Sequence, residues 1–242
     1  KKKGQGSGQK PATKDEEGDK KVKQPAKRQK KSKGTEEGDD IGANVGLFTL
    51  MAAVRVGSGG AVHAFEPSAR EFARLTEHVR MNGLGDRVHA VRMAVADAEG
   101  TAVLHVAEDA HSGHNTLSDG FANTTVVQTA LEEVPLRTLD RYVREAGVRR
   151  LDVVKMDVEG SEGRVLAGAR DVLRTLQPRL LFEVNEGALR RQGSSSEALR
   201  QLLYDAGYAL WEIDDASGML RPLDAGLPAG SQDVVAAPVG SL

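Results

Sequence analysis

Short apolar runs alternate with amphipathic segments from residue 41 to residue 236, and this alternation predicts an α/β fold. We expect strands at the apolar runs, which cover residues 61–65, 88–93, 101–106, 126–136, 151–159, 180–185, 208–213 and 233–236. Apolar positions three or four residues apart predict helices over residues 45–56, 68–82, 139–146, 165–176 and 195–206. The order of these elements is typical of a doubly wound sheet.

Capping signals mark the ends of several of these helices. Ser68 with Glu71, and Ser194 with Glu197, have the spacing of a capping box, in which a hydroxyl and a carboxylate bond backbone amides that lack a helical partner. Glycine or proline supplies the stops, at Gly83, Gly147, Pro178 and Gly207.

The stretch Asp40-Ile41-Gly42-Ala43-Asn44-Val45-Gly46 predicts a turn that opens a helix. Gly42 and Gly46 allow close approach of the backbone, and Asn44 is a suitable N-cap. The helix behind the turn would bury one face, made of Val45, Phe48, Ala52 and Val56. Free amides at the start of a helix attract an anionic group, here a carboxylate.

Glycine spacing in this turn bears on the ligand. Glu66 lies twenty residues beyond Gly46, about the distance at which nucleotide-binding folds place the acid that holds a ribose. The pattern G-x-x-x-G differs from the G-x-G-x-x-G that seats a pyrophosphate, so it favours a nucleoside ligand without one. The plainer alternative is a strand–helix turn that binds nothing.

A buried strand should lead into this turn, but residues 34–40 contain no Val, Ile or Leu. Central parallel strands are usually rich in these residues. We therefore expect either a very short first strand or the loss of the strand that the fold requires.

Acidic residues follow two of the apolar runs. Asp157 and Glu159 end the clearest run and would point the same way on a strand, and Glu183 and Asn185 end the next run. Parallel sheets bind ligands at the carboxyl ends of their strands, so these side chains are candidate substrate contacts. They could instead hold Mg²⁺ through oxygen ligands, or form a solvated strand end beside an acidic helix start.

The polar stretch 108–125 contains His111 and His114 and could contact substrate, as loops at the rim of a scaffold often do. The two histidines could also form half of a metal site, although no partner ligands stand nearby in the sequence. An ordinary loop is the remaining alternative.

Charge divides the chain of 242 residues into two parts. Residues 1–33 carry a net charge of +9, whereas the remainder carries −11. Val22 is the only large apolar residue before residue 38, so we expect residues 1–38 to be a disordered Lys-rich tail and residues 39–242 to be the folded domain. The tail could engage nucleic acid or an anionic surface, although a solvated linker is the simpler interpretation.

Composition excludes several classes of function. The chain has no cysteine, which excludes disulfides, thiolate catalysis and zinc–thiolate sites. It has no run of about 18 apolar residues, so we expect no membrane span. Nothing in the sequence names a compartment, and we take the cytoplasm as the default.

Four motifs in order resemble the FkbM-type family of S-adenosylmethionine-dependent methyltransferases, over about residues 39 to 237. They are the residues of the turn at 40–46, Ala-Phe-Glu-Pro at 64–67, Lys-Met-Asp-Val-Glu-Gly-Ser-Glu at 155–162 and Leu-Phe-Glu at 181–183. The resemblance implies a mostly parallel, seven-stranded sheet whose last strand is antiparallel. It also implies methyl transfer from S-adenosylmethionine, usually to a hydroxyl of a sugar or a small natural product.

Site residues follow from the resemblance by position. The 40–46 turn, with Asp40, Gly42, Asn44 and Gly46, would hold the methionine end of the cofactor, and Glu66 would hold the ribose. Ala94 and Val95 would lie near the adenine, with Asp97 close by. Asp157 and Glu159 would border the methyl and substrate region. Predicted placement at the rim where the strands end makes Asp157, Glu159, Glu183 and His114, in that order, the candidate general bases. No resident metal is expected.

Two other classes of protein remain as alternatives. A degenerate, non-catalytic methyltransferase domain could act as a binding module through its basic tail. A nicotinamide-dependent oxidoreductase is disfavoured by the glycine spacing. The sequence does not name the acceptor, and methylation of nitrogen stays open.

Overall fold

The computed structural model describes residues 36–117, 125–214, 216–223, 227 and 231–241, all of which belong to one compact unit, Lys33–Leu242. Residues 1–35 of the expected Lys-rich tail lie outside the described residues. The first strand begins at Glu37, two residues before the predicted domain boundary at residue 39.

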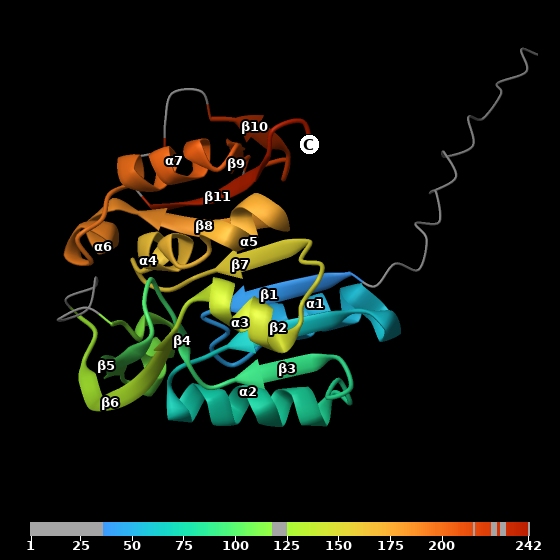
Figure 1. Ribbon diagram of the computed structural model, residues 1–242. Coiled ribbons are helices and arrows are strands. Elements are labelled where there is room, and N and C mark those ends of the chain that lie inside the picture. Colours follow the sequence, from blue (N-terminus) through green and yellow to red (C-terminus); the bar gives the residue numbers. More distant parts are fainter. Residues whose placement is uncertain (1–35, 118–124, 215, 224–226, 228–230, 242) are drawn as a thin grey trace, which may run out of the picture. The chain divides into compact units, whose positions relative to one another are not determined.

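The main sheet has eight strands in the order β10-β9-β11-β8-β7-β1-β2-β3 (Figure 1). Their bounds are β1 Glu37–Ile41, β2 Ala61–Phe65, β3 Val88–Val91, β7 Val153–Met156, β8 Arg179–Asn185, β9 Tyr208–Ile213, β10 Leu220–Pro222 and β11 Ser231–Pro238. Strands β3, β2, β1, β7 and β8 are parallel, and β11 is antiparallel to both of its neighbours, β8 and β9. This confirms the mostly parallel, seven-stranded sheet with an antiparallel last strand, to which β10 adds a short eighth strand at the edge.

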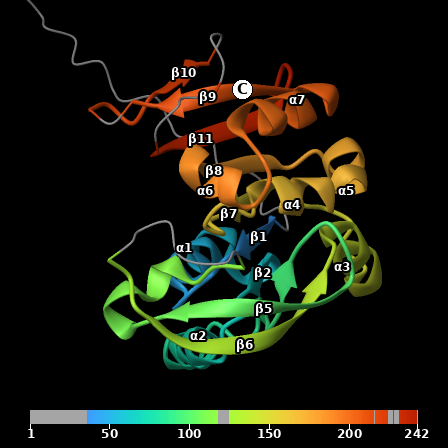
Figure 2. The same ribbon diagram turned by 90° about the vertical axis from the view of Figure 1, so that its left-hand side faces the viewer.

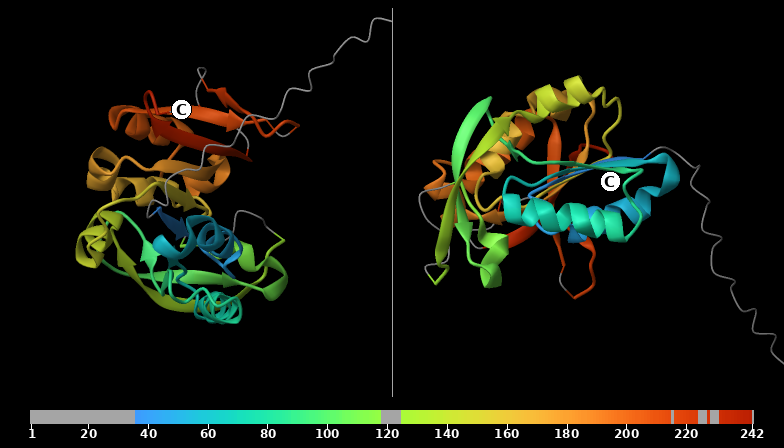
Figure 3. Two further views of the ribbon diagram at one scale, coloured as in Figure 1. Left: turned by 90° about the vertical axis from the view of Figure 1, so that its right-hand side faces the viewer. Right: turned by 90° about the horizontal axis from the view of Figure 1, so that it is seen from below.

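Helices cover both faces of the sheet. They are α1 Leu47–Val56, α2 Ala69–Met81, α3 Leu139–Ala146, α4 Glu162–Ala167, α5 Arg170–Thr175, α6 Glu186–Arg191 and α7 Ser196–Asp205. Side chains of β2 alternate between the faces: Val62 and Ala64 pack with α1 and α2, whereas Phe65 contacts Tyr142 of α3. Figure 3, seen from below, shows α2 and α3 on opposite sides of the strands. None of the helices in the described part of the chain is long and apolar enough to cross a membrane.

Strand β1 forms although it is polar. It lies between β2 and β7 and pairs with both, so its backbone is bonded on both sides. Ile41 packs in the core, and the side chains of Asp39 and Asp40 are buried as well. Neither carboxylate oxygen of Asp39 has a hydrogen-bond partner among the described residues, and burial raises the pKa of this group well above its ordinary value. The strand is therefore neither lost nor very short: β1 has five residues, as many as β2, and forms from a polar sequence.

The predictions for the first helix were partly wrong. Gly46, with φ 95°, is the N-cap of α1, and Asn44 lies two residues earlier with φ 49°. The buried residues of α1 are Thr49 and Ala53, whereas Phe48 is 44% exposed. The buried side of α1 is therefore offset by one position from the predicted face.

Two other helices also differ from their predictions. The single helix expected over residues 165–176 is broken into α4 and α5 at Gly168, where a Cβ atom would lie 2.0 Å from the carbonyl oxygen of Ala96. Asp140 then caps α5 by accepting hydrogen bonds from the backbone of Asp171 and Val172. In α7 the cap is Ser195, whose hydroxyl accepts from Ala198 at 3.1 Å, and the predicted Ser194 is one residue too early.

A second sheet of three strands stands at the carboxyl end of the parallel strands (Figure 2). It contains β4 Ala94–Val95, β5 Gly100–Ala107 and β6 Gln128–Arg137, in the order β4-β6-β5. The strands expected at 101–106 and 126–136 are thus present but pair with each other, and the strand expected over 88–93 ends at Val91. A 3-10 helix, η2 Asp109–His114, follows β5 within the polar stretch 108–125, which was expected to be a loop.

Candidate cofactor and active site

A cavity opens where β1, β2 and β7 end. Its walls come from the turn after β1, the end of β2, β4, η2 and the turn after β7, which are far apart in the sequence. Five of the eight predicted cofactor residues line it, namely Gly42, Asn44, Glu66, Ala94 and Val95.

The turn after β1 has a shape that only glycine permits at its centre. Gly42 has φ 76°, and a Cβ atom there would lie 1.9 Å from the carbonyl oxygen of Asp157. The amides of Gly42 and Ala43 both donate to the carbonyl oxygen of Phe65, which ties this turn to the end of β2. Gly46 does not line the cavity, and it instead gives room for the side chain of Leu75 on α2.

Glu66 is a buried carboxylate at the edge of this cavity, with 4% of its surface exposed. It accepts hydrogen bonds from the backbone amides of Asn44 at 2.8 Å and Ser68 at 2.9 Å. Burial raises the pKa of Glu66 to about 7, and the two amide hydrogen bonds limit the rise. Since an ionised carboxylate has about four acceptor positions, this arrangement leaves room for further donors such as hydroxyl groups.

One end of the cavity is apolar. Met93, Ala94, Val95 and Leu104 are buried there, and all four line the cavity. Asp97, which was expected near the adenine, is not among the lining residues and forms an ion pair with Arg164 at 2.9 Å. This end of the cavity can therefore hold a flat apolar group. Hydrogen bonds to the polar atoms of such a group would come from the backbone and from side chains other than Asp97.

Asp40 lies beneath the turn rather than in the cavity. Its carboxylate accepts a hydrogen bond from Thr49 Oγ1 at 2.6 Å and lies 3.3 Å from Lys155 Nζ. Burial raises the pKa of Asp40, while Lys155 and Thr49 oppose the rise. Lys155 also donates to the carbonyl oxygen of Gly42 at 3.1 Å and lies 3.7 Å from Asp157 Oδ2. It thus connects the turns after β1 and β7.

Lys155 had no role in the sequence analysis. A charged residue inside an otherwise apolar run, Val153 to Met156, was a signal that it meets a buried partner. The partner itself, Asp40, could be found only once β1 and β7 were known to pair.

The predicted arrangement of Asp157 and Glu159 on a strand was wrong. Strand β7 ends at Met156, and Glu159 has φ 51°, so the two acids lie in a turn. Asp157 lines the cavity and is half-exposed. Glu159 lies beside it and binds His114, whose Nδ1 is 3.0 Å from Glu159 Oε1. Burial raises the pKa of Glu159, and the contact with His114 opposes this.

Glu183 does not line the cavity. Its carboxylate accepts a hydrogen bond from Ser231, and together with Ile213 and Asp233 it borders a separate hollow near the end of β8. Among the residues that the structure describes, no group of three or more His, Asp or Glu side chains is placed to hold a metal ion.

Two polar atoms at the cavity lack partners. Asn44 Oδ1 and Ser161 Oγ are buried without a hydrogen bond in the described structure, and both residues line the cavity. Buried polar atoms are nearly always bonded, so these two positions fit a ligand that carries polar groups. The sequence analysis missed Ser161, although it belongs to the 155–162 motif.

Glu162 was also missed. Its Oε1 accepts weakly from the backbone amides of Val158 and Gly160, and burial raises the pKa of its carboxyl group to about 7. It therefore shapes the turn after β7.

The sheet order, the antiparallel β11 between β8 and β9, and the cavity at the ends of β1 and β2 together define an α/β fold of the methyltransferase type. Residues 40–210 match the family model described as the methyltransferase FkbM domain, so the chain belongs to this family.

Several known proteins are similar to this chain. The 31-O-demethyl-FK506 methyltransferase FkbM of Streptomyces tacrolimicus is 30% identical over 155 residues, which cover 54% of this chain and 58% of that protein. The 2-O-methyltransferase NoeI of Sinorhizobium fredii is 28% identical, with 55% and 57% covered. This chain therefore spans little more than half of either relative. A crystal structure of methyltransferase FkbM from Methylobacillus flagellatus aligns with TM-score 0.49 and 15% identity, over 84% of this chain and 44% of that one.

Proposed function

We propose that this protein binds S-adenosylmethionine in the cavity and transfers its methyl group to a hydroxyl oxygen of a small molecule or glycan. The observation that carries the proposal is Glu66, a buried carboxylate that keeps free acceptor positions at the edge of the cavity. Ribose hydroxyls can donate hydrogen bonds to these free acceptor positions of Glu66. Membership of the FkbM family implies the use of this cofactor.

Other cavity residues fit the remaining parts of such a cofactor. The apolar end at Ala94 and Val95 suits an adenine ring, and the turn around Gly42 and Asn44 suits the amino-acid end. Asp40 and Gly46 would act indirectly, because they support this turn from outside the cavity. Asp97 would keep Arg164 beside the adenine end.

When bound, the cofactor supplies a methyl group on a cationic sulfur, which leaves as a neutral thioether once the methyl is transferred. The residues of this chain would align the acceptor oxygen and remove its proton. Proton removal by a positioned base is usually worth about 10²- to 10⁴-fold in rate. Asp157 lines the cavity and is the first candidate, and His114 held by Glu159 is the second. Glu183 borders another hollow and is the weakest of the four.

Oxygen is the proposed acceptor atom because the names of two relatives specify it. One is a 31-O-demethyl-FK506 methyltransferase and the other is a 2-O-methyltransferase. This chain covers little more than half of either relative, so their acceptors do not transfer to it.

The test is a calorimetric titration with S-adenosylmethionine, followed by assays of labelled methyl transfer to hydroxylated acceptors. Glu66→Ala should weaken binding, whereas Glu77→Ala, on the exposed side of α2, should not. Asp157→Asn should reduce turnover more than binding. Wild-type protein that folds without binding the cofactor would refute the proposal.

A further inference from the structure

One wall of the cavity is a polar segment with nothing apolar to hold it in place. None of the residues of η2 is buried, and His111 interrupts its helical geometry with φ −127°. Yet Ser112, Gly113 and the following Asn115 line the cavity. Because apolar burial does not fix η2, its position depends on polar contacts with neighbouring elements.

Glu71, in the first turn of α2, is the centre of those contacts. Its side chain is fully buried, and it accepts hydrogen bonds from Ser68 Oγ, from Arg70 Nε at 2.6 Å and from Asn115 Nδ2 at 3.2 Å. Asn115 Oδ1 in turn accepts from the backbone of Ala107 at 2.8 Å. The carboxylate therefore anchors the residue that directly follows η2.

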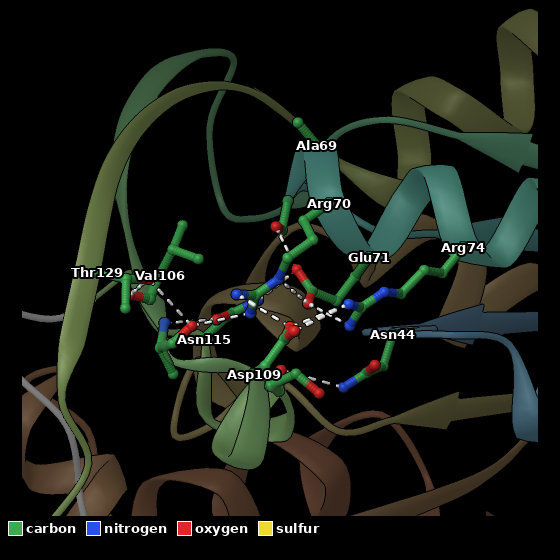
Figure 4. Close-up of polar contacts among 12 residues, drawn as sticks. Asn44, Ala69, Arg70, Glu71, Arg74, Val106, Asp109, Asn115 and Thr129 are labelled. Atoms are coloured by element: carbon green, nitrogen blue, oxygen red, sulfur yellow. Dashed lines mark hydrogen bonds and ion pairs between the residues drawn. The ribbon is translucent and has the colours of Figure 1, made fainter.

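Two arginines of α2 hold the other end of the segment. Arg70 donates to the carbonyl oxygen of Ala107 at 2.8 Å and lies 3.3 Å from Asp109. Arg74 lies 3.0 Å from Asp109. Figure 4 shows Arg70, Arg74 and Glu71 converging on Asp109 and Asn115. One guanidinium group, that of Arg70, thus bonds the buried carboxylate, the end of β5 and the first residue of η2.

This network is continuous with the expected ribose acid. The backbone amide of Ser68 donates to Glu66, while the hydroxyl of the same residue donates to Glu71. On the opposite side, the amide of Asn44 donates to Glu66, and its side chain donates to the carbonyl oxygen of Ser112 at 3.1 Å. A closed ring of hydrogen bonds therefore joins η2 to the carboxylate at the edge of the cavity.

We infer that Glu71 and Arg70 are positioning residues of the cofactor site: they fix η2 against the cavity and so determine how tightly a nucleoside cofactor is held. The inference rests on the proposed function. Neither side chain lines the cavity, so both act through Asp109 and Asn115. Without them, the wall is disordered for a larger share of the time, and binding must reorder it at the expense of affinity.

Two substitutions test separately the charge of Glu71 and the planar guanidinium geometry of Arg70. Glu71→Gln keeps the shape of the side chain and removes its charge. Arg70→Lys keeps the charge but cannot bond three acceptors as a planar guanidinium does. Glu77→Gln and Arg80→Lys are matched controls, because this pair forms a similar fork at 2.6 and 2.8 Å on the exposed face of the same helix.

The readouts are backbone hydrogen exchange over residues 108–117 and the affinity for S-adenosylhomocysteine by calorimetry. Both site variants should speed exchange in this segment, leave β1 and β2 protected, and weaken binding by roughly tenfold, which corresponds to the loss of one charged hydrogen bond. Saturating S-adenosylhomocysteine should restore protection to the segment. The control variants should match wild type in both measurements.

Affinities of the site variants equal to those of the controls would overturn the inference, as would exchange that rises equally in every strand. If Glu71→Gln does not fold, Arg70→Lys decides, because its side chain is 29% exposed and leaves the apolar core intact. If wild-type protein does not bind S-adenosylhomocysteine, the proposed function fails. Exchange over residues 108–117 then still decides whether Glu71 and Arg70 fix the wall.

Discussion

Replacing Glu66 by Gln removes a buried ionisable group, and the structure predicts how the pH dependence of stability changes. Burial raises the pKa of Glu66 from 4.5 to about 7. Between these two values the folded protein holds a proton that the unfolded chain has released. The free energy of unfolding therefore falls as the pH rises through this range.

The size of the effect follows from the same pKa values. Each pKa unit corresponds to about 1.4 kcal/mol, so ionising Glu66 in the folded protein costs about 3 kcal/mol. A Gln side chain does not ionise, so the variant does not lose this stability as the pH rises. Gln also leaves one of the amides of Asn44 and Ser68 without an acceptor, which costs about 1–3 kcal/mol at every pH and does not alter the slope.

The assay is urea unfolding of wild type and Glu66→Gln at pH 5, 6, 7 and 8, without cofactor. From pH 5 to pH 8, the stability of the variant should improve relative to wild type by roughly 2–3 kcal/mol, because part of the full effect lies outside this range. Glu162 and His63 also have pKa values shifted by burial, but they titrate in both proteins and cancel in the difference. Parallel pH profiles for the two proteins would refute the reasoning.

Three further predictions follow from other contacts. Gly42→Ala should abolish cofactor binding and lower the thermal midpoint more than Gly83→Ala, since both positions have positive φ but only Gly42 faces a backbone oxygen; equal midpoints would contradict this. Lys155→Met should cost about 3 kcal/mol in urea unfolding, because it leaves the buried Asp40 without its cation, and an unchanged midpoint would count against that pairing. Burial lowers the pKa of His63 from 6.5 to about 4, so the stability that it contributes above pH 6.5 should be lost as the pH falls toward 4. His63→Gln should flatten this part of an acid titration, and an identical acid profile would exclude His63 as the cause.

Much of the sheet could be predicted because apolar alternation reports which side chains are buried. The runs at 61–65, 180–185 and 208–213 all became strands near those bounds. The spacing between Gly46 and Glu66 placed the turn after β1 and the end of β2 at the same edge. Such patterns lie within single segments, so the sequence shows them directly.

The missed features depend on contacts between distant segments. The burial of Asp39 and Asp40 in β1 follows from pairing on both sides, which no local pattern reveals. At Gly168, where the predicted helix is broken, there is no room for a Cβ atom beside the carbonyl oxygen of Ala96, seventy-two residues earlier in the chain. Ser68 and Glu71 were predicted to form a capping box, but neither side chain caps α2, and the Glu71 carboxylate instead bonds Ser68 Oγ and Asn115 on a different element. In each case the partner lies on a distant segment of the chain, so the residue type did not identify it.

The central claim is that a nucleoside cofactor lies in the cavity with its ribose on Glu66. A crystal structure of the protein with S-adenosylhomocysteine tests this most directly. It should show the ribose hydroxyls within about 2.6–3.2 Å of the Glu66 carboxylate, with the adenine against Ala94 and Val95. Density for the compound outside the cavity, or a ribose that does not contact Glu66, would contradict the account.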